Sequence, residues 1–187
     1  MDEAIETIEY RGHEIKIYQD TDAESPREFD NIGTMMCAHR NYNLGDAQAD
    51  GDAIREKAAE VEKAGGIVLP LYLYDHSGIT MNTTGFSCPW DSGQVGIIYV
   101  MPEKGREEFG RQWKKKATKY LKGEVETYDQ YLTGDVYGYV VEGPDSNDSC
   151  WGFFGKKYAI EEAKGNIDAS IQHEAKQSKL CAEVTAI

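Results

Sequence analysis

An α+β domain, built on a largely antiparallel sheet with helices packed on one face, is the fold that this sequence predicts. The chain opens on two alternating segments joined by Arg11-Gly12, and its later apolar runs follow short turns at least as often as they follow helices. This order favours an antiparallel sheet over a doubly wound parallel one. With 187 residues and no linker or tandem repeat, we expect a single domain over residues 1–187.

The strands are predicted from alternation and from short apolar runs. Residues 4–19 alternate apolar and polar side chains on both sides of Arg11-Gly12, which predicts a hairpin with one buried face. Further strands are expected at residues 32–38, 67–74, 79–82, 93–100, 135–141 and 150–154. Pro70 lies inside one of these runs. Because proline gives no N–H to a sheet, we place it at an edge or a bulge.

In three segments, apolar residues recur at helical spacing. The first begins at Asp52, the expected N-cap, and ends at Gly65-Gly66. The longest runs from residue 103 to 132, and Gly123 is able to interrupt it, because glycine costs about 1 kcal/mol in a helix interior relative to alanine. The last covers residues 157–179.

Composition indicates a folded protein without a membrane span. The chain is 40% hydrophobic and 28% charged, and its apolar runs fall short of the ~20 residues that cross a bilayer. The acidic start MDEAIETIEY is unlike a signal peptide. We therefore expect a cytoplasmic protein with no membrane partner. The four cysteines are widely spaced, which predicts reduced thiols.

The charge is strongly negative and uneven. Lys and Arg number 20 against 33 Asp and Glu, for a net charge of −13. Residues 1–30 hold ten acids and three bases, and residues 123–150 hold seven acids and no base. Nucleic acid repels such a protein and basic surfaces attract it, so we expect no direct binding of nucleic acid. Solubility alone is the other explanation of this charge.

The loop after the strand at residues 67–74 gathers reactive side chains. His76, Cys88 and Asp91 lie there, with Asp75 just before them. A thiol hydrolase needs a cysteine beside a histidine that a carboxylate orients, so these residues form an alternative catalytic site. Pro89 removes the backbone N–H that often helps to form an oxyanion hole. In the simpler interpretation Cys88 packs as a small apolar residue and catalysis has no part.

Metal and cofactor sites have little support. Cys37, His39, His76 and Cys88 contain the residue types of a zinc site, but one residue between the first two is fewer than the two to four usual between zinc ligands. The sequence also has no glycine-rich phosphate-binding motif. We expect neither a metal nor a cofactor.

The second acidic block also contains several tyrosines. Tyrosine beside carboxylate suits protein recognition, although core packing explains alternate tyrosines equally well. Interpreted as a surface, the block predicts these partner-binding residues: Glu124, Glu126, Asp129, Tyr131, Asp135, Glu142, Asp145 and Asp148.

Four blocks resemble an uncharacterised family of proteins encoded by phages and mobile elements. They read SPREFDNIGTMMCAHRNYNLGD, LPLYLYDHSGITMNTTGFSCPWDSGQVGIIYV, VETYDQYLTGDVYGYVVE and DSCWGFFG. By analogy with small acidic anti-CRISPR and anti-restriction proteins, the resemblance implies an inhibitor that mimics nucleic acid and binds a host defence protein or complex. The alternative is a cysteine-dependent hydrolase that uses Cys88 and His76.

Overall fold

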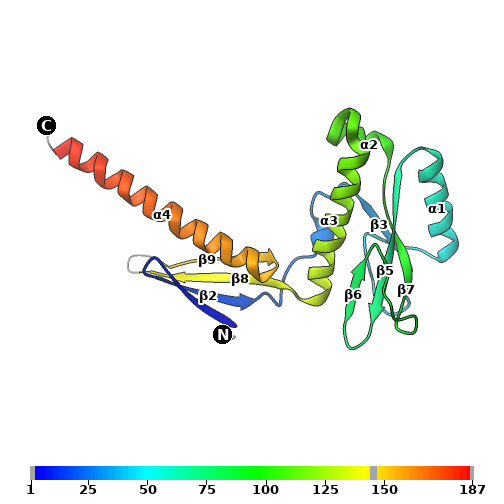
Figure 1. Ribbon diagram of the computed structural model, residues 1–187, viewed down its shortest axis with the longest axis horizontal. Helices are drawn as coiled ribbons and strands as arrows, with labels where there is room; N and C mark the ends of the chain where they lie inside the picture. The colour runs from blue at the N-terminus through cyan, green and yellow to red at the C-terminus, as the bar shows by residue number, and fades with distance from the viewer. Residues whose placement is uncertain (1–2, 144–146, 186–187) are drawn as a thin grey trace. The chain divides into compact units, whose positions relative to one another are not determined.

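The chain forms two compact units in the computed structural model, which describes residues 3–143 and 147–185 (Figure 1). The terminal unit combines Met1–Ala23 with Gly134–Ile187, and the central unit is Glu24–Thr133. Each unit has its own sheet and its own hydrophobic core. The α+β class and the largely antiparallel pairing are confirmed, although two sheets replace the one expected. That residues 1–187 form a single domain stays a prediction.

In the terminal unit, both ends of the chain contribute strands to one antiparallel sheet. The order is β1-β2-β8-β9, formed by β1 (Glu6–Tyr10), β2 (His13–Gln19), β8 (Val136–Glu142) and β9 (Asn147–Phe154). The predicted hairpin turns at Arg11 and Gly12, whose φ angles of 51° and 81° match the left-handed pair of a two-residue turn. The helix α4 (Lys156–Thr185) packs on one face of this sheet.

The core of the terminal unit joins that sheet face to the first half of α4. Its buried side chains are Ile15, Ile17, Tyr139, Val141, Ala163 and Ile167. Successive strand residues point to opposite faces, so Glu14, Lys16 and Val140 point away from the helix. We call this side the open face.

The central unit is a five-stranded sheet in the order β4-β3-β7-β5-β6. Its strands are β3 (Thr34–Cys37), β4 (Ala47–Gln48), β5 (Ile67–Asp75), β6 (Ile79–Asn82) and β7 (Ser92–Val100), and only the β3–β4 pair is parallel. Pro70 lies in the part of β5 that pairs with β7 alone, one residue before a bulge at Leu71/Tyr72. It therefore lies at an edge of the sheet and beside a bulge, as predicted.

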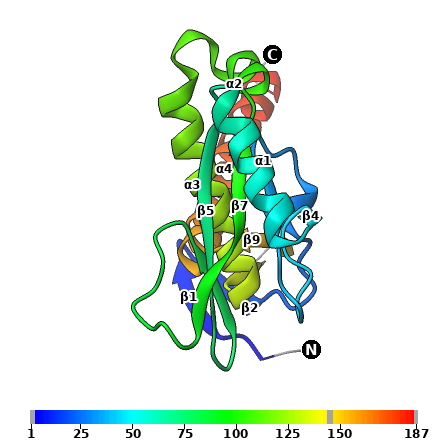
Figure 2. The same cartoon turned by 90° about the vertical axis from the view of Figure 1, so that its right-hand side faces the viewer.

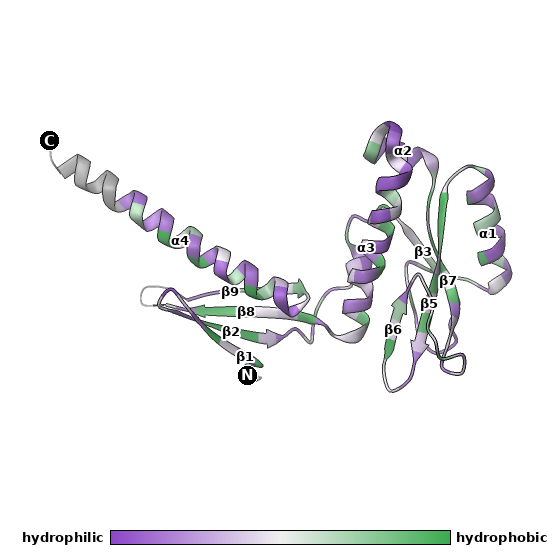
Figure 3. Cartoon of the chain, in the orientation of Figure 1, coloured by the Kyte–Doolittle hydropathy of each residue, from purple (hydrophilic) through white to green (hydrophobic). Residues whose placement is uncertain are grey.

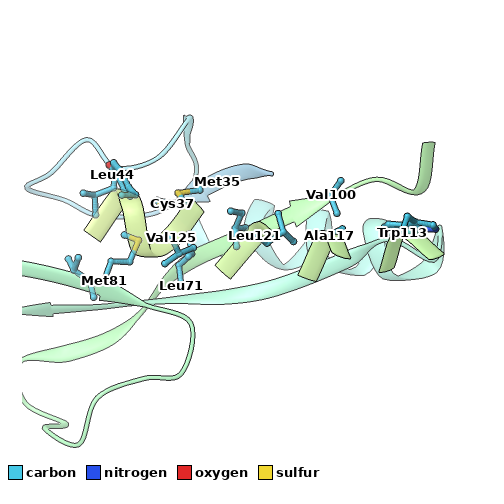
Figure 4. Packing of buried hydrophobic residues seen from close by; sticks show 13 residues of the cluster. Met35, Cys37, Leu44, Leu71, Met81, Val100, Trp113, Ala117, Leu121 and Val125 are labelled. Carbon is cyan, nitrogen blue, oxygen red and sulfur yellow. The ribbon is translucent and has the colours of Figure 1, made fainter. Parts of the chain in front are cut away.

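Helices cover both faces of the central sheet rather than one. The helix α1 (Gly51–Lys63) lies on one face, and α3 (Trp113–Thr133) lies on the other (Figures 1 and 2). Ala117, Leu121 and Val125 of α3 pack against the apolar side chains of β5 and β7 (Figure 4). In Figure 3 both helices alternate hydrophilic and hydrophobic residues, as helices with one buried side do.

Some helix boundaries differ from the predicted ones. Asp50 rather than Asp52 caps α1, by accepting a hydrogen bond from the amide of Ala53. The long helix is interrupted near Gly110, between α2 (Pro102–Phe109) and α3, and continues through Gly123. Two short 3-10 turns, Pro26–Glu28 and Gly110–Gln112, complete the unit. Among the described residues, no helix combines the length and apolar character that crossing a bilayer requires.

Candidate functional site

The loop proposed as a catalytic alternative is held between β5 and β7. The amide of Asp75, the last residue of β5, donates a hydrogen bond of 2.8 Å to the carbonyl of Asp91, which directly precedes β7. The hydroxyl of Ser92 donates to the carbonyl of Cys88 and closes the returning loop. These bonds bring His76, Cys88 and Asp91 together, as the sequence predicted.

The order of these three groups differs from that of a thiol hydrolase. The Cys88 thiol donates to Asp91 Oδ2 at 3.5 Å, and His76 Nδ1 lies 3.7 Å from the same oxygen. A hydrolase needs the imidazole to take the thiol's proton while the carboxylate orients the imidazole. Here the carboxylate lies between thiol and imidazole, and it accepts the thiol's hydrogen itself.

Aromatic side chains surround this loop. Tyr74 packs near Phe86, with ring centroids 5.7 Å apart, and Trp90 is 91% exposed. The Tyr42 hydroxyl donates to Asp75 Oδ1 at 3.3 Å, and the charge of that carboxylate raises the pKa of Tyr42. The loop region thus exposes Trp90 and Tyr42 beside two carboxylates.

The four zinc-type residues do not converge on a metal site. Cys37 is fully buried in the central core, and this burial raises the pKa of its thiol to about 12. His39 stacks on Tyr42, and its Nδ1 accepts hydrogen bonds from the amides of Asn41 and Tyr42. Within residues 3–143 and 147–177 no group of three histidine, cysteine or acidic side chains is placed to hold a metal.

Glu124, the first predicted partner-binding residue, is mostly buried in the central unit. Its side chain is 12% exposed and pairs with Arg27 at 3.0 Å. It also accepts hydrogen bonds from the amides of Ile32 and Gly33. The carboxylate therefore joins the loop before β3 to α3.

Of the other predicted residues on α3, Asp129 and Tyr131 contact neighbouring parts of the fold and Glu126 is exposed. Asp129 accepts hydrogen bonds from the Thr80 hydroxyl at 2.7 Å and from the Met81 amide at 2.6 Å, which ties β6 to α3. Tyr131 is partly buried and stacks on Tyr128. Glu126 is exposed. Of the four acidic-block residues on α3, Glu126 is thus the most accessible to a partner.

The remaining predicted residues belong to the terminal unit. Asp135 accepts a hydrogen bond from Tyr137, and Glu142 pairs with Lys16 at 2.7 Å while staying exposed. Asp148 is also exposed and accepts a hydrogen bond from Asn166 of α4. Asp145 lies outside the described residues. The acidic block is thus divided between two units, and no single surface can be assigned to it.

The open face of the terminal sheet carries an acidic surface of which sequence reasoning predicted only Glu142. Glu9 pairs in register with Glu14 across β1 and β2. The carboxylates of Glu14 and Glu142 lie 3.0 Å and 2.7 Å from Lys16 Nζ, and their hydrogen bonds raise the pKa of that amine. One lysine thus lies among three glutamates on this face.

Next to these glutamates is a shallow hollow with an aromatic floor. We call it the Trp151 pocket, and it is lined by Tyr18, Gln19, Asp20, Thr21, Asp22, Val140, Glu142 and Trp151. It is assembled by the pairing of β2 with β8 and of β8 with β9. The alternation in residues 13–19 does predict that Glu14, Lys16 and Tyr18 share a face, but no local pattern shows that β8 lies beside them.

Comparison of the chain with protein-family models, with curated proteins and with solved structures finds no match.

Proposed function

We propose that the protein is a non-enzymatic, phage-encoded acidic binding protein that inhibits a host defence complex of CRISPR or restriction type. In this proposal it occupies a basic surface on which the host complex binds nucleic acid, so its carboxylates take the place of phosphates. The net charge of −13 and the resemblance to phage-encoded proteins support the proposal.

The distribution of charge along the chain is the main support for this proposal. Residues 1–23 and 134–187 hold sixteen acids against seven bases, whereas residues 24–133 hold seventeen against thirteen. The excess is therefore concentrated in the terminal unit, whose open face presents Glu9, Glu14 and Glu142. Exposed charges of one sign steer a partner of opposite sign over long range and increase the association rate. A basic surface is the partner that such a face attracts.

The loop geometry in the central unit favours binding over hydrolysis. Asp91 separates His76 from Cys88, so the imidazole is not the group that accepts the thiol's hydrogen. The hydrolase alternative requires substitutions at Cys88 or His76 to abolish the biological effect. In the binding proposal the same substitutions leave it intact.

The test compares matched charge reversals in a phage-defence assay and in binding to purified host nucleic-acid-handling complexes. Glu9→Lys with Glu14→Lys reverses the open face, and Glu56→Lys with Glu62→Lys makes the same charge change on exposed positions of α1. We expect the first pair to lose inhibition and the second pair, together with Cys88→Ala, to retain it.

Salt provides the second readout. Because exposed charges are screened within about 8 Å at physiological ionic strength, binding should weaken steeply as salt rises. A complex that is insensitive to salt, or equal loss of inhibition in both reversal pairs, contradicts the proposal. Loss of inhibition in Cys88→Ala alone supports the hydrolase.

A further inference from the structure

The floor of the Trp151 pocket is an indole that lies flat on β8. A Cβ atom placed on Gly138 would be 2.2 Å from Trp151 Cε3, so the ring occupies the space that the missing side chain leaves. Tyr18 adjoins it, with ring centroids 6.0 Å apart and planes 37° apart. Trp151 is nevertheless 48% exposed. A large aromatic face is therefore held in place and left accessible.

The rim of the pocket carries oriented negative charge. Asp20 accepts hydrogen bonds from the Gly152 amide at 3.1 Å and from the Asp22 amide at 3.2 Å, which fix its carboxylate beside the indole. In the described part of the chain, neither Asp20 nor Asp22 has a lysine or arginine partner. Glu142, by contrast, is already paired with Lys16. Two carboxylates next to the aromatic floor thus lack a cation.

We infer that the Trp151 pocket receives one arginine side chain of a basic protein partner, with its guanidinium stacked on the indole and paired with Asp20 and Asp22. A planar guanidinium matches both a flat ring and a carboxylate fork, whereas a lysine ammonium is a strongly hydrated point charge. Cations are attracted to the face of an indole. Nucleobases also stack on indoles, but their phosphates are repelled by these carboxylates.

This inference rests on the proposed function, because it names the chemistry by which the acidic protein recognises its basic partner. Bulk charge attracts many basic surfaces alike. The pocket adds selection for a surface that projects an arginine. It therefore predicts an effect of Trp151 that does not depend on net charge.

The test is a titration of the full chain with the peptide acetyl-(Gly-Arg)4-amide, followed by NMR of the tryptophan indole N–H signals. Matched peptides replace every arginine with citrulline, which is neutral and of similar shape, or with lysine. We expect the arginine peptide to shift the Trp151 signal, the lysine peptide to bind more weakly and the citrulline peptide to have no effect. Trp151→Ala should weaken binding of the arginine peptide about fivefold, since an exposed cation–π contact contributes about 1 kcal/mol.

Trp90→Ala is the control, because it removes an exposed tryptophan from the central unit without changing the charge. Asp20→Asn with Asp22→Asn should weaken binding as Trp151→Ala does, and this pair keeps the indole in place. Equal binding by Trp151→Ala and the unmodified chain overturns the inference, as does equal binding of the arginine and citrulline peptides. Equal binding of arginine and lysine peptides overturns the guanidinium assignment.

The experiments can contradict either proposal without contradicting the other. If the peptide result holds while no host complex is bound, the pocket is correct and the anti-defence function is wrong. If host complexes are inhibited in a salt-dependent manner by Trp151→Ala as well as by the unmodified chain, the function holds without the pocket.

Discussion

The guanidinium of Arg27 is enclosed by groups of opposite charge. Its side chain is 5% exposed, and it donates to both oxygens of Asp46 at 2.7–2.8 Å and to Glu124 at 3.0 Å. It also donates to the carbonyl of Gly33 at 2.8 Å. Removing one partner from a buried network leaves the remaining charges without compensation, which costs more than an intact pair contributes. Arg27 is therefore a structural residue of the central unit.

We predict that Arg27→Met lowers the free energy of unfolding by about 3 kcal/mol, because the mostly buried carboxylate of Glu124 would be left without its cation and the partly exposed Asp46 would lose two hydrogen bonds. Urea denaturation followed by circular dichroism measures it. Arg55→Met is the matched control, since Arg55 pairs with Asp52 at an exposed site, and a change below about 0.5 kcal/mol is expected there. A loss below about 1 kcal/mol in Arg27→Met would contradict the proposed network.

The Cys37 thiol makes stability depend on alkaline pH. Burial, and secondarily the charge of Asp46, raises its pKa in the folded state from 9.0 to about 12. The contribution is fully present below pH 9 and is lost as pH rises toward 12, because the unfolded thiol ionises first. At pH 10.5 this loss is about 2 kcal/mol.

Urea titrations at pH 7.5 and 10.5 measure this loss. In Cys37→Ala, the free energy of unfolding should fall by about 2 kcal/mol less between pH 7.5 and pH 10.5 than it does in the unmodified chain. This holds whatever the stability of the variant at pH 7.5. Cys88→Ala removes a thiol that is not fully buried and serves as the control. Its free energy of unfolding should change between the two pH values as much as that of the unmodified chain. If the free energy of unfolding depends on pH equally in Cys37→Ala and in the unmodified chain, this thiol does not titrate as stated.

At the residue scale, the sequence indicated which chemical types were present but not which were accessible. Cys88, His76 and Asp91 do meet, because they lie in one loop whose ends are joined by adjacent strands. Glu124 and Asp129 were predicted to bind a partner, yet their carboxylates hold backbone amides of distant segments. Local periodicity places them beside the buried stripe of a helix. It does not show which loop lies against that helix.

At the scale of elements, the break between α2 and α3 was not visible in the hydrophobic pattern. The buried stripe continues across it, since Trp113 and Ala117 follow Phe109 at helical spacing. Gly110 has φ 68° and ψ −149°, a conformation that is essentially restricted to glycine. Gly123, the expected interruption, is an ordinary helical residue, and apart from its own helix backbone no atom lies within 4 Å of an added Cβ. Backbone conformation, rather than the presence of a glycine, decides where the helix ends.

Alanine substitutions at these two glycines should therefore have opposite effects. Gly110→Ala is predicted to destabilise the protein by about 1–3 kcal/mol, because alanine is strained at that backbone conformation. Gly123→Ala is predicted to stabilise it by about 0.5–1 kcal/mol, because alanine favours the helix interior. Thermal unfolding of the two variants side by side measures both signs. Stabilisation by Gly110→Ala would mean that the chain does not turn there as described.

The strands and helices were largely predictable, and their assembly was not. Alternation and helical period are local properties, so the first hairpin, α1 and the strands β5 to β7 were found at close to their observed bounds. The pairing of β2 with β8 joins segments that are far apart in the sequence. No local property of either strand specifies the other. That pairing creates the second sheet and the Trp151 pocket, and both were missed for the same reason.

At the scale of the whole molecule, the central unit is an insertion between two strands of the terminal sheet. Its core cluster is drawn entirely from residues 32–132, and the core of the terminal unit is drawn from residues 8–17 and 137–171. The points where the chain leaves and re-enters the terminal unit are adjacent. The Asp20 amide donates to the Val136 carbonyl at 2.8 Å, and Gln19 donates to the Gly134 carbonyl at 2.9 Å. Adjacent ends are typical of an inserted folding unit.

We therefore predict that residues 24–133 fold when expressed alone. All the side chains of their core are retained, and so is the Arg27 network with Asp46 and Glu124. The fragment should unfold cooperatively in urea, with the emission of its buried Trp113 changing together with circular dichroism.

The complementary experiment joins residue 23 to residue 134 through a short Gly-Ser linker, which the adjacency of Asp20 and Val136 permits. This chain should retain the terminal sheet, α4 and the Trp151 pocket, and it should bind acetyl-(Gly-Arg)4-amide as the full chain does. A fragment 24–133 that lacks a cooperative transition, while the full chain unfolds in a single step with both units coincident, would instead establish residues 1–187 as one folding domain.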